Sequence, residues 1–466
     1  MPAGAINSSK VLTLGAALAG VLLLATGAEH LGYDASYALL WGKELAGGHV
    51  PAFHGPVAPT PHPLAIALGA VLSPLGTSAA GDALVALTTL SLAVAALAAA
   101  RLARRLGGPA AGAIALVAVA SRPQLAAGAW RGAVDLPALA LVLLALNALT
   151  AGPPRPRRAL WLLLPAGLLR PEVWALALAT GAWAATRPGG RRRRLGRAAL
   201  AVAAPALWLL WDLVLTGDPL FSLRGTQQLA DQLDRPRTAS LAPLLAGPSI
   251  RVVLGLPLML AGIAGLVLLA RRGGDHARLL IGVVLASLVS FGVLGLAGLP
   301  LLARYLLVPA TLLAICAAVA ATAPRGSRIA WAIAVLLLVA VPGTATGVRD
   351  AVRDGRTRRA TQASLHALVA ARPFRAAVAR CGRVAVASYL LRPEVARGAG
   401  LTAARVAGAD DADAALVLPA SGAAVETLLG AGRSTAEAPL LTVPAGARLL
   451  TPRGGDWVLA SCRSPR

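Results

Sequence analysis

Long apolar stretches separated by short polar segments run along the first three quarters of the chain. A helix of about 20 apolar residues crosses the hydrocarbon core of a bilayer, with all its backbone groups paired internally. The pattern therefore predicts about eleven membrane-spanning helices of roughly this kind. They lie at 10–27, 80–100, 109–121, 135–151, 159–169, 172–186, 198–216, 250–270, 279–298, 303–322 and 328–346. A shorter apolar piece occupies 63–75, and 159–186 is either two spans or one broken span.

The first span has a second interpretation. An apolar stretch after a short basic start, as at 10–27, is also typical of a cleavable signal peptide. Because many spans follow it, we expect a retained helix.

Composition supports a membrane protein. Of the 466 residues 57% are hydrophobic and 14% are charged, and the mean hydropathy is +0.70. A soluble domain carries about 25% charged residues. The net charge of +24 does not indicate nucleic-acid binding, because the arginines form short clusters between apolar spans.

These arginine clusters predict the orientation. With the N-terminus inside, all five clusters fall on the cytoplasmic side, as the positive-inside rule requires. They are RLARR (101–105), PPRPRR (153–158), RPGGRRRRLGR (187–197), RRGGDHAR (271–278) and PRGSR (324–328). An odd number of spans places the C-terminus outside. The usage of Ala and Arg is typical of GC-rich bacteria, so we expect a multi-pass protein of a bacterial plasma membrane.

The C-terminal tail differs in kind. After a basic, helix-like stretch at 349–379, short β-like runs at 383–388, 414–420 and 456–461 alternate with helical pieces. We predict a mostly α fold. A polytopic transmembrane helical bundle at 1–346 is followed by a small extracytoplasmic α/β domain at 347–466.

The three cysteines fit this division. Cys316 lies within a span, where it is a small buried apolar residue. Cys381 and Cys462 each lie beside a predicted strand of the tail. In an oxidising compartment they are expected to form a disulfide. Two unpaired thiols are the alternative.

The first predicted outer loop contains an aspartate at the membrane surface. Asp34 lies in the segment GYDASY, before a stretch at 36–46 suited to the membrane interface as an amphipathic helix. A carboxylate there costs free energy unless it has a partner or a task. Capping of the helix is one interpretation, and a role as general base is the other. Tyr37 and His62 of the same loop are candidate substrate-binding residues.

The other predicted outer loops supply more acids and arginines. They are Arg122, Arg131 and Asp135 in the second loop, Arg170 and Glu172 in the third, and Arg304 at the start of the tenth span. Asp135 could cap the helix that follows it, and Arg170 with Glu172 could stabilise a turn. Together the arginines could instead bind an anionic head group through charge-assisted hydrogen bonds.

Other kinds of site are weakly indicated. The chain has no GxxxxGK[ST] motif, which argues against ATP-driven transport. Histidines of the first loop, with Glu29, could bind a divalent metal, although their spacing matches no standard motif. They are His30, His49, His54 and His62. No cofactor is required by the sequence, and a divalent metal stays possible.

Several motifs resemble those of the GT-C glycosyltransferases, which include protein O-mannosyltransferases and lipid A aminoarabinose transferases. GYDASY, GGHVP and PTPHPL resemble their first outer loop, and LLRPEVW, GDPLFS and ARYLLVP resemble later elements. The resemblance covers about residues 10–346. The tail resembles the variable outer domain of many members.

The resemblance implies an inverting transferase that moves a sugar from a polyprenyl-phosphate donor to an extracytoplasmic glycan, lipid or protein. It assigns the general base to Asp34 and the phosphate side to Arg170 and Arg304, with Asp135 as the second-loop acid. Many members have two adjacent acids in the first loop. Here Ala35 follows Asp34, which weakens a metal-assisted mechanism.

Two functions are therefore considered. The first is a hexosyl- or pentosyltransferase, and mannose and arabinose are the first sugars to consider for it. The second is a non-catalytic transporter of polyprenyl-phosphate lipids or a membrane protein of envelope assembly. Only the first requires a base at Asp34.

Overall fold

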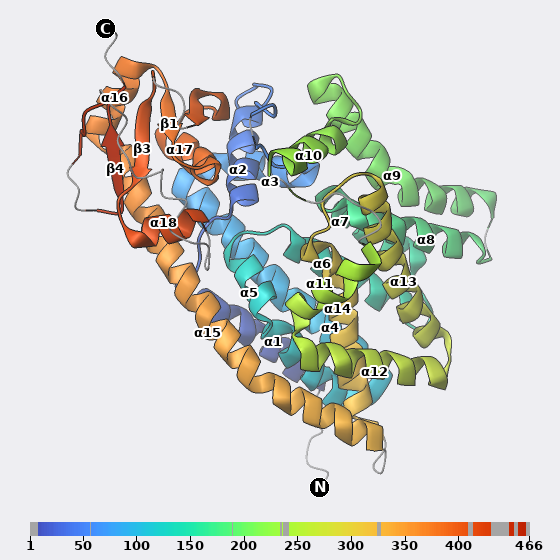
Figure 1. The fold of residues 1–466 in the computed structure, drawn as a ribbon. Coiled ribbons are helices and arrows are strands. Elements are labelled where there is room, and N and C mark those ends of the chain that lie inside the picture. Colours follow the sequence, from blue (N-terminus) through green and yellow to red (C-terminus); the bar gives the residue numbers. More distant parts are fainter. Residues whose placement is uncertain are drawn as a thin grey trace. The chain divides into compact units, whose positions relative to one another are not determined.

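The computed structural model confirms a mostly α-helical membrane protein with a small β-sheet (Figure 1). It describes residues 8–55, 57–188, 190–233, 235, 242–323, 328–408, 413–429, 447–451 and 455–462. The predicted basic loop at 324–328 lies outside the described residues, except for Arg328.

The chain divides into two compact units. The bundle unit comprises Met1–Thr26, His62–Leu64 and Ala86–Ala351, and the sheet unit comprises Gly27–Pro61, Ala65–Val85 and Val352–Arg466. The sheet unit thus combines most of the predicted C-terminal domain with the first outer loop. The boundary between predicted domains, at 346/347, falls within a continuous helix.

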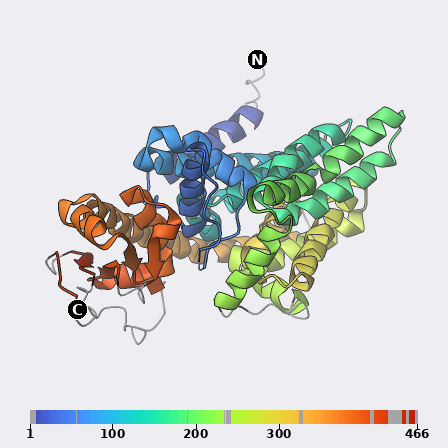
Figure 2. The ribbon, with the colours of Figure 1, turned by 90° about the horizontal axis from the view of Figure 1, so that it is seen from above.

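The helices of the bundle unit follow the predicted spans. They are α1 (Ser8–Leu24), α4 (Thr77–Ala120), α5 (Pro123–Trp130), α6 (Asp135–Leu149), α7 (Pro156–Leu169), α8 (Trp174–Ala185), α9 (Arg191–Thr216), α10 (Phe221–Gln232), α11 (Ala242–Leu254), α12 (Leu256–Arg272), α13 (Asp275–Leu296), α14 (Leu307–Ala321) and α15 (Arg328–Ala370). The first turns of α4 and the second half of α15 belong to the sheet unit. Helix α7 packs against α6, α8 and α9, and Figure 2 shows α8 and α9 side by side.

Apolar side chains on the outside of these helices suit a lipid environment. Leu296 of α13, Val214 of α9 and Leu338 of α15 are 78%, 70% and 70% exposed. In water such a surface would be costly, whereas in lipid it is the expected exterior. The protein is therefore a multi-pass membrane protein.

The number of candidate spans depends on how bent helix pairs are counted. Among the described residues, five helices are long and apolar enough to cross a membrane. The count rises to seven if the bent pairs α5 with α6 and α11 with α12 each form one span. Helices α7 and α8 have 14 and 12 residues, fewer than the ~20 of a direct crossing. The count of eleven stays a prediction.

Helix α4 contains both the second and the third predicted spans. Its backbone leaves the helical conformation at Gly108, whose φ of 87° is accessible because glycine has no Cβ. The arginines at 101–105 were expected in a loop, but they lie in the last turns before this break. Cations are favourable there because a helix C-terminus carries partial negative charge.

Hydrogen bonds group the basic segments at one end of the bundle unit. Arg105 Nη1 donates to Asn147 O at 2.7 Å and to Thr150 Oγ1 at 3.0 Å. Thr150 O also lies 3.3 Å from His276 Nε2, and Thr322 Oγ1 donates to Gly107 O at 3.3 Å. Four of the five predicted cytoplasmic loops begin or end beside these residues.

A second set of contacts joins the other predicted loops. Trp130 Nε1 donates to Leu23 O at 3.0 Å, and Gln227 Nε2 donates to Ala297 O at 2.7 Å. Asp135 and Thr150 lie at opposite ends of α6, whose 15 residues separate the two sets by about 22 Å.

The sheet unit contains the predicted strands and one more. They are β1 (Val384–Val386), β2 (Val406–Gly408), β3 (Ala415–Pro419) and β4 (Trp457–Ala460), in the order β2-β1-β3-β4. Strand β1 is parallel to β2 and β3, and β4 is antiparallel to β3. Apolar side chains such as Ala385, Leu416 and Val458 form its core.

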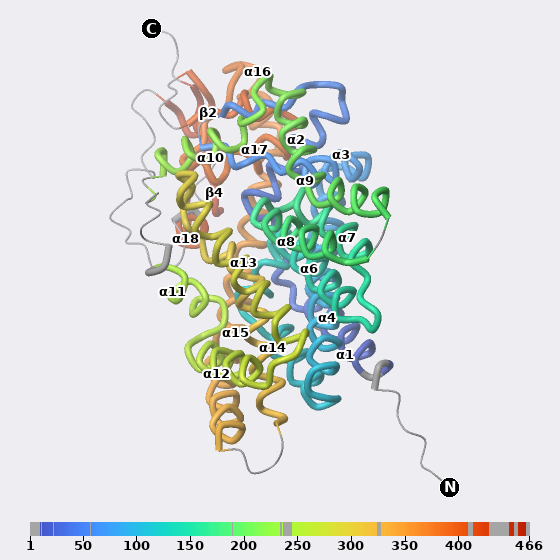
Figure 3. Tube along the Cα trace, turned by 90° about the vertical axis from the view of Figure 1, so that its right-hand side faces the viewer, coloured from blue at the N-terminus to red at the C-terminus, as the bar shows by residue number. Residues whose placement is uncertain are grey.

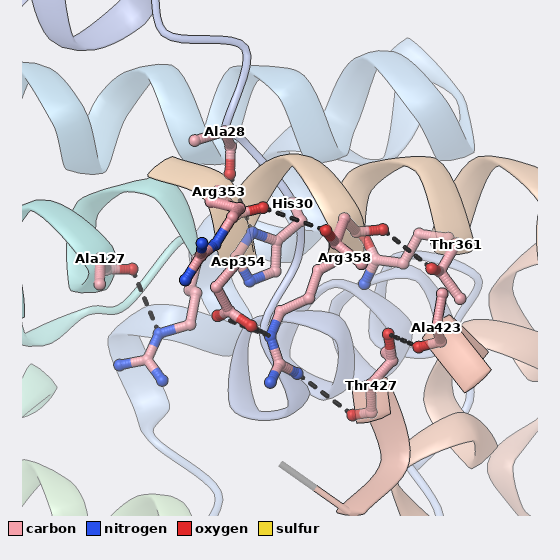
Figure 4. Close-up of polar contacts among 12 residues, drawn as sticks. Ala28, His30, Ala127, Arg353, Asp354, Arg358, Thr361, Ala423 and Thr427 are labelled. Carbon is pink, nitrogen blue, oxygen red and sulfur yellow. Dashed lines mark hydrogen bonds and ion pairs between the residues drawn. The ribbon is translucent and has the colours of Figure 1, made fainter. Parts of the chain in front are cut away.

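The sheet unit also contains helices (Figure 3). They are α2 (Tyr33–Ala46), α3 (Pro63–Leu72), α16 (Arg372–Cys381), α17 (Arg392–Ala399) and α18 (Gly422–Leu429). Arg358 of α15 pairs with Asp354 at 2.9 Å and donates to Thr427 O of α18 at 3.1 Å (Figure 4). Cys381 and Cys462 are joined by a disulfide, with Cα atoms 5.9 Å apart.

Candidate active site

The predicted outer-loop residues fall into two groups, one in each unit. Asp34 and Tyr37 belong to the sheet unit. The others belong to the bundle unit, where some come together and others do not; they are His62, Arg122, Arg131, Asp135, Arg170, Glu172 and Arg304.

Four of these residues form a buried ionic cluster in the bundle unit: Asp135, Arg170, Glu172 and Arg304. Arg170 follows α7 in an extended conformation, because the proline after it disfavours the helical region. Pro171 then begins a 3₁₀ turn, η2 (Pro171–Val173), which carries Glu172. A second 3₁₀ turn, η4 (Ala303–Leu306), carries Arg304.

The ionic cluster contains two negative and two positive side chains. Arg170 Nη2 bonds the carboxylate of Asp135, and its Nε lies 4.0 Å from Glu172 Oε1. Arg304 is close enough to Glu172 to interact electrostatically. Its guanidinium carbon lies 5.9 Å from the ring centroid of Tyr305. Two acids thus face two arginines, as buried charges require.

Some buried polar atoms of the ionic cluster make no hydrogen bond to a described residue. Within the described part of the chain, Nε of Arg170 and Oε2 of Glu172 are buried and make no hydrogen bond. Buried polar groups are almost always hydrogen-bonded. The cluster therefore has donor and acceptor capacity for a polar ligand in addition to its internal pairs.

Asp135 and Asp34 do not occupy the helix-capping positions that offered the simpler explanation. The N-cap residues of α6 and α2 are Val134 and Gly32, and neither makes a side-chain capping bond. Both aspartates lie in the first turn instead. A negative charge is stabilised there by the helix dipole.

Asp34 is half-buried among aromatic residues of the sheet unit. The ring of Tyr33 lies 5.0 Å from that of Tyr37 and 5.4 Å from that of Tyr389, and its hydroxyl donates to Val57 O. Burial raises the pKa of Tyr33 and of Tyr37, so both phenols are neutral near pH 7. Of the titratable side chains in this turn, Asp34 is thus the one suited to accept a proton.

Helix α2 is more deeply buried than expected. All side chains from Ala35 to Gly42 are buried, and Trp41 and Phe53 pack with ring centroids 5.0 Å apart. The burial of this stretch therefore does not follow the pattern of an amphipathic helix, and its place at the membrane interface stays a prediction. Ser36 and Glu44 bond other parts of the sheet unit, whereas Lys43 is exposed.

Three candidate residues make contacts within the bundle unit. Arg122 is buried and donates to Leu254 O at 2.9 Å and to Thr344 Oγ1, which stabilises the break between α11 and α12. Arg131 Nε donates to Ala127 O within its own helix end, at 3.2 Å (Figure 4). The ring of His62 lies 5.5 Å from that of Trp208, edge to face.

The structure contains a buried acid that the sequence analysis missed. Asp212 of α9 accepts hydrogen bonds from Ser222 N at 2.9 Å and Ser222 Oγ at 2.8 Å. Its position within the apolar run LWLLWDLVL was the available signal, since acids inside spans are rare.

Glu394 and Arg392 of α17 are also buried and were also missed. They belong to the sequence LLRPEV at 390–395, which is identical to LLRPEV at 168–173. This repeat was the signal that could have identified them.

A metal site is not formed by the described residues. Within them, no three His, Cys, Asp or Glu side chains are grouped closely enough to hold a metal ion. The candidate histidines of the first loop therefore form no group of three ligands in the described residues. His30 Nδ1, for example, lies 2.9 Å from Ala28 O (Figure 4).

Comparison with solved structures identifies the fold. Comparison with protein-family models and with curated protein sequences gives no match. The chain is similar to ArnT from Cupriavidus metallidurans bound to undecaprenyl phosphate, with a TM-score of 0.60 and 15% identity over 99% of this chain and 100% of that one. The apo state of the same protein gives a TM-score of 0.57 and 14% identity over 97% and 98%.

A third similar structure is the archaeal oligosaccharyltransferase AglB from Archaeoglobus fulgidus, in complex with an inhibitory peptide and a dolichol-phosphate. It has a TM-score of 0.49 and 13% identity, covering 84% of this chain and 64% of that one. The similarity to ArnT supports the fold that the outer-loop motifs indicated. The chain has the fold of ArnT over 99% of its length.

Proposed function

We propose that this protein is a membrane glycosyltransferase that moves a hexose or pentose from a polyprenyl-phosphate donor to an extracytoplasmic acceptor. The observation that carries the proposal is the ArnT fold over 99% of the chain, together with the undecaprenyl phosphate bound to ArnT. Mannosyl or arabinosyl transfer to a glycan, lipid or protein fits this proposal.

Asp34 is the proposed general base. It takes the proton of the acceptor hydroxyl while the hydroxyl oxygen bonds to the anomeric carbon. The bond from that carbon to the phosphate oxygen breaks, and its electron pair leaves with polyprenyl phosphate. A single displacement of this kind inverts the anomeric configuration. The half-buried position of Asp34 beside neutral tyrosines supports this role.

The ionic cluster is the proposed phosphate-binding group of the bundle unit. The guanidinium of Arg170 is held by Asp135, and Arg304 is close enough to Glu172 to interact with it electrostatically. Planar guanidinium groups bind phosphate oxygens in pairs. The unused Nε of Arg170 supports a further bond to such a ligand. Tyr37, His62, Arg122 and Arg131 have weaker support, since the contacts described for them are with residues outside the ionic cluster.

The proposed orientation places the basic end of the bundle unit in the cytoplasm of a bacterium. Grouping of four basic segments by Arg105, Thr150 and Thr322 supports one common side for them. The disulfide between Cys381 and Cys462 supports an oxidising environment for the sheet unit. The active face would then be extracytoplasmic.

Turnover of a panel of polyprenyl-phosphate sugars tests this function. Purified protein in lipid is mixed with each donor and an envelope extract, and release of free polyprenyl phosphate is measured. We expect release with one donor class, dependent on the extract, and a product of inverted configuration by NMR. Binding of polyprenyl phosphate without release from any donor would favour the lipid transporter or assembly protein instead.

A further inference from the structure

The second LLRPEV segment shares its sequence with the first but not its backbone conformation. Arg170 is extended and precedes the turn Pro171–Val173, whereas Arg392 is helical and begins α17. In both copies the arginine is buried. The first copy supplies Arg170 and Glu172 to the ionic cluster. The second copy, at 390–395, lies in the sheet unit, which also contains Asp34.

Glu394 of this second copy connects three helices. Its Oε1 accepts the hydroxyl of Ser36 in α2, and its Oε2 lies 2.8 Å from His366 Nε2 of α15. Arg397 of α17 lies 3.6 Å from the same carboxylate and donates to Thr77 O at 2.7 Å. Ser36 is 0% exposed and Glu394 is 4% exposed, so water does not compete for these bonds.

Ser36 and Asp34 share the first turn of α2. Two residues apart in one helical turn, they move together, because the backbone of a helix is rigid on this scale. The bond from Ser36 to Glu394 therefore fixes the turn that carries Asp34. Helix α2 packs directly against α17, which holds Glu394.

We propose that Glu394 is a positioning residue for Asp34 and acts through Ser36. The inference rests on the proposed function, since it gives Asp34 its catalytic task. A displacement of about 1 Å in a catalytic group can cost about 100-fold in rate. Because His366 and Arg397 hold the Glu394 carboxylate, its bond to Ser36 restrains the turn of Asp34 against such a displacement.

Asp456 provides a matched control. Its carboxylate is also shared between two serines of the sheet unit, accepting from Ser364 Oγ at 2.8 Å and from Ser421 Oγ at 2.6 Å. Neither serine belongs to α2. Asp456→Ala therefore removes a comparable acid from the same unit without touching the turn of Asp34.

The first test separates kcat from KM. Ser36→Ala and Glu394→Ala are expected to lower kcat by about 10- to 100-fold and to leave the KM for the donor unchanged. In an Asp34→Asn background, Glu394→Ala should cause little further loss, because the base it positions is already gone. Asp456→Ala should leave kcat unchanged per folded molecule. A kcat of Glu394→Ala equal to that of Asp456→Ala would overturn the proposal.

The second test does not depend on activity. Asp34→Cys introduces a thiol into a chain whose own cysteines are buried or in a disulfide. The rate at which a water-soluble maleimide alkylates this thiol reports the position of the turn. We expect Glu394→Ala to change that rate severalfold and Asp456→Ala to leave it unchanged. Equal rates in both variants would contradict positioning, even if the wild type proved not to transfer sugar.

Discussion

At the scale of single residues, the pKa values of two acids of the sheet unit, buried Glu394 and half-buried Glu44, are shifted in opposite directions. Burial alone would raise the pKa of Glu394, but the hydrogen bond to His366 and the charge of Arg397 hold it below its ordinary value. For Glu44, burial raises the pKa despite hydrogen bonds from the backbone N–H groups of Ala52 and Ala403. The difference arises because His366 and Arg397 outweigh the burial of Glu394, whereas the backbone N–H groups and His49 do not outweigh the burial of Glu44.

These shifts predict opposite pH dependences of stability. The unfolded pKa of a glutamate is about 4.3. Glu394 stabilises the fold above that value, and its contribution is lost as pH falls through its lower folded pKa. Glu44 has a folded pKa above that value, so its contribution is present below the unfolded pKa and is lost as pH rises.

Thermal unfolding of two variants across the acid range tests the signs. Glu394→Gln should weaken the loss of stability at low pH, and Glu44→Gln should weaken the loss as pH rises. A change of the same sign in both variants would show that the assignment of partners is incorrect.

The pair of Arg170 and Asp135 predicts a large effect of mutation. Arg170→Ala leaves the buried carboxylate of Asp135 without its partner, which should cost about 3–5 kcal/mol in the free energy of unfolding. Arg224→Ala is the control, since Arg224 pairs with Asp218 at 2.6 Å and its side chain is 66% exposed. Loss of that exposed pair should cost less than about 1 kcal/mol. Similar melting temperatures for the two variants would argue against a buried cluster.

At the scale of elements, glycines set how closely helices cross. A Cβ at Gly265 of α12 would lie 2.3 Å from Cys316 O of α14, and one at Gly262 would lie 2.6 Å from the Cβ of Leu313. In the sheet unit, a Cβ at Gly42 would lie 2.3 Å from the backbone of Gly69. Backbone atoms cannot move aside as a side-chain end can. Small residues at helix contacts are typical of membrane proteins, where close approach of backbones drives association.

Gly265→Ala is expected to destabilise the bundle unit by about 1–3 kcal/mol, because the added methyl group has no room. Gly292→Ala in α13 is the control, since nothing lies within 4 Å of the added carbon. There the substitution should be neutral or stabilising by up to about 1 kcal/mol, through helix propensity. Unfolding in detergent, followed by circular dichroism, compares the two. Equal stability would contradict the close packing of α12 on α14.

The elements themselves were largely predictable. Apolar length located the helices, and the β-like runs at 383–388, 414–420 and 456–461 contain β1, β3 and β4. Strand β2 was missed because its three residues, Val406–Gly408, include a small alanine and a glycine and carry almost no pattern. The break of α4 falls at Gly108, next to Pro109, where a boundary was expected.

At the scale of the whole molecule, the local sequence pattern predicted side-chain contacts less well than it predicted helices and strands. Outer-loop position suggested one group of acids and arginines, of which the structure brings Asp135, Arg170 and Arg304 together with Glu172. Pairing could not be predicted, because it depends on tertiary contacts between distant segments. Nothing in the first loop indicates that Ser36 bonds Glu394, 358 residues away. The sequence analysis missed that glutamate, and the repeated LLRPEV segment was the signal that could have identified it.

The disulfide makes the orientation testable. In intact cells, after reduction, Cys381 and Cys462 should react with a membrane-impermeant thiol reagent, whereas the buried Cys316 should not. Replacing both by serine gives the background signal. Labelling only after the membrane is permeabilised would place the sheet unit in the cytoplasm and overturn the odd number of spans.

Donor turnover and donor binding, measured together on Asp34→Asn, test the central claim most directly. A missing general base should lower release of polyprenyl phosphate by about 10²- to 10⁴-fold, while the affinity for the donor stays as in the wild type. That result would support glycosyl transfer with Asp34 as base. Unchanged release in Asp34→Asn would contradict the catalytic role, and donor binding without release in either protein would favour a lipid transporter or assembly protein.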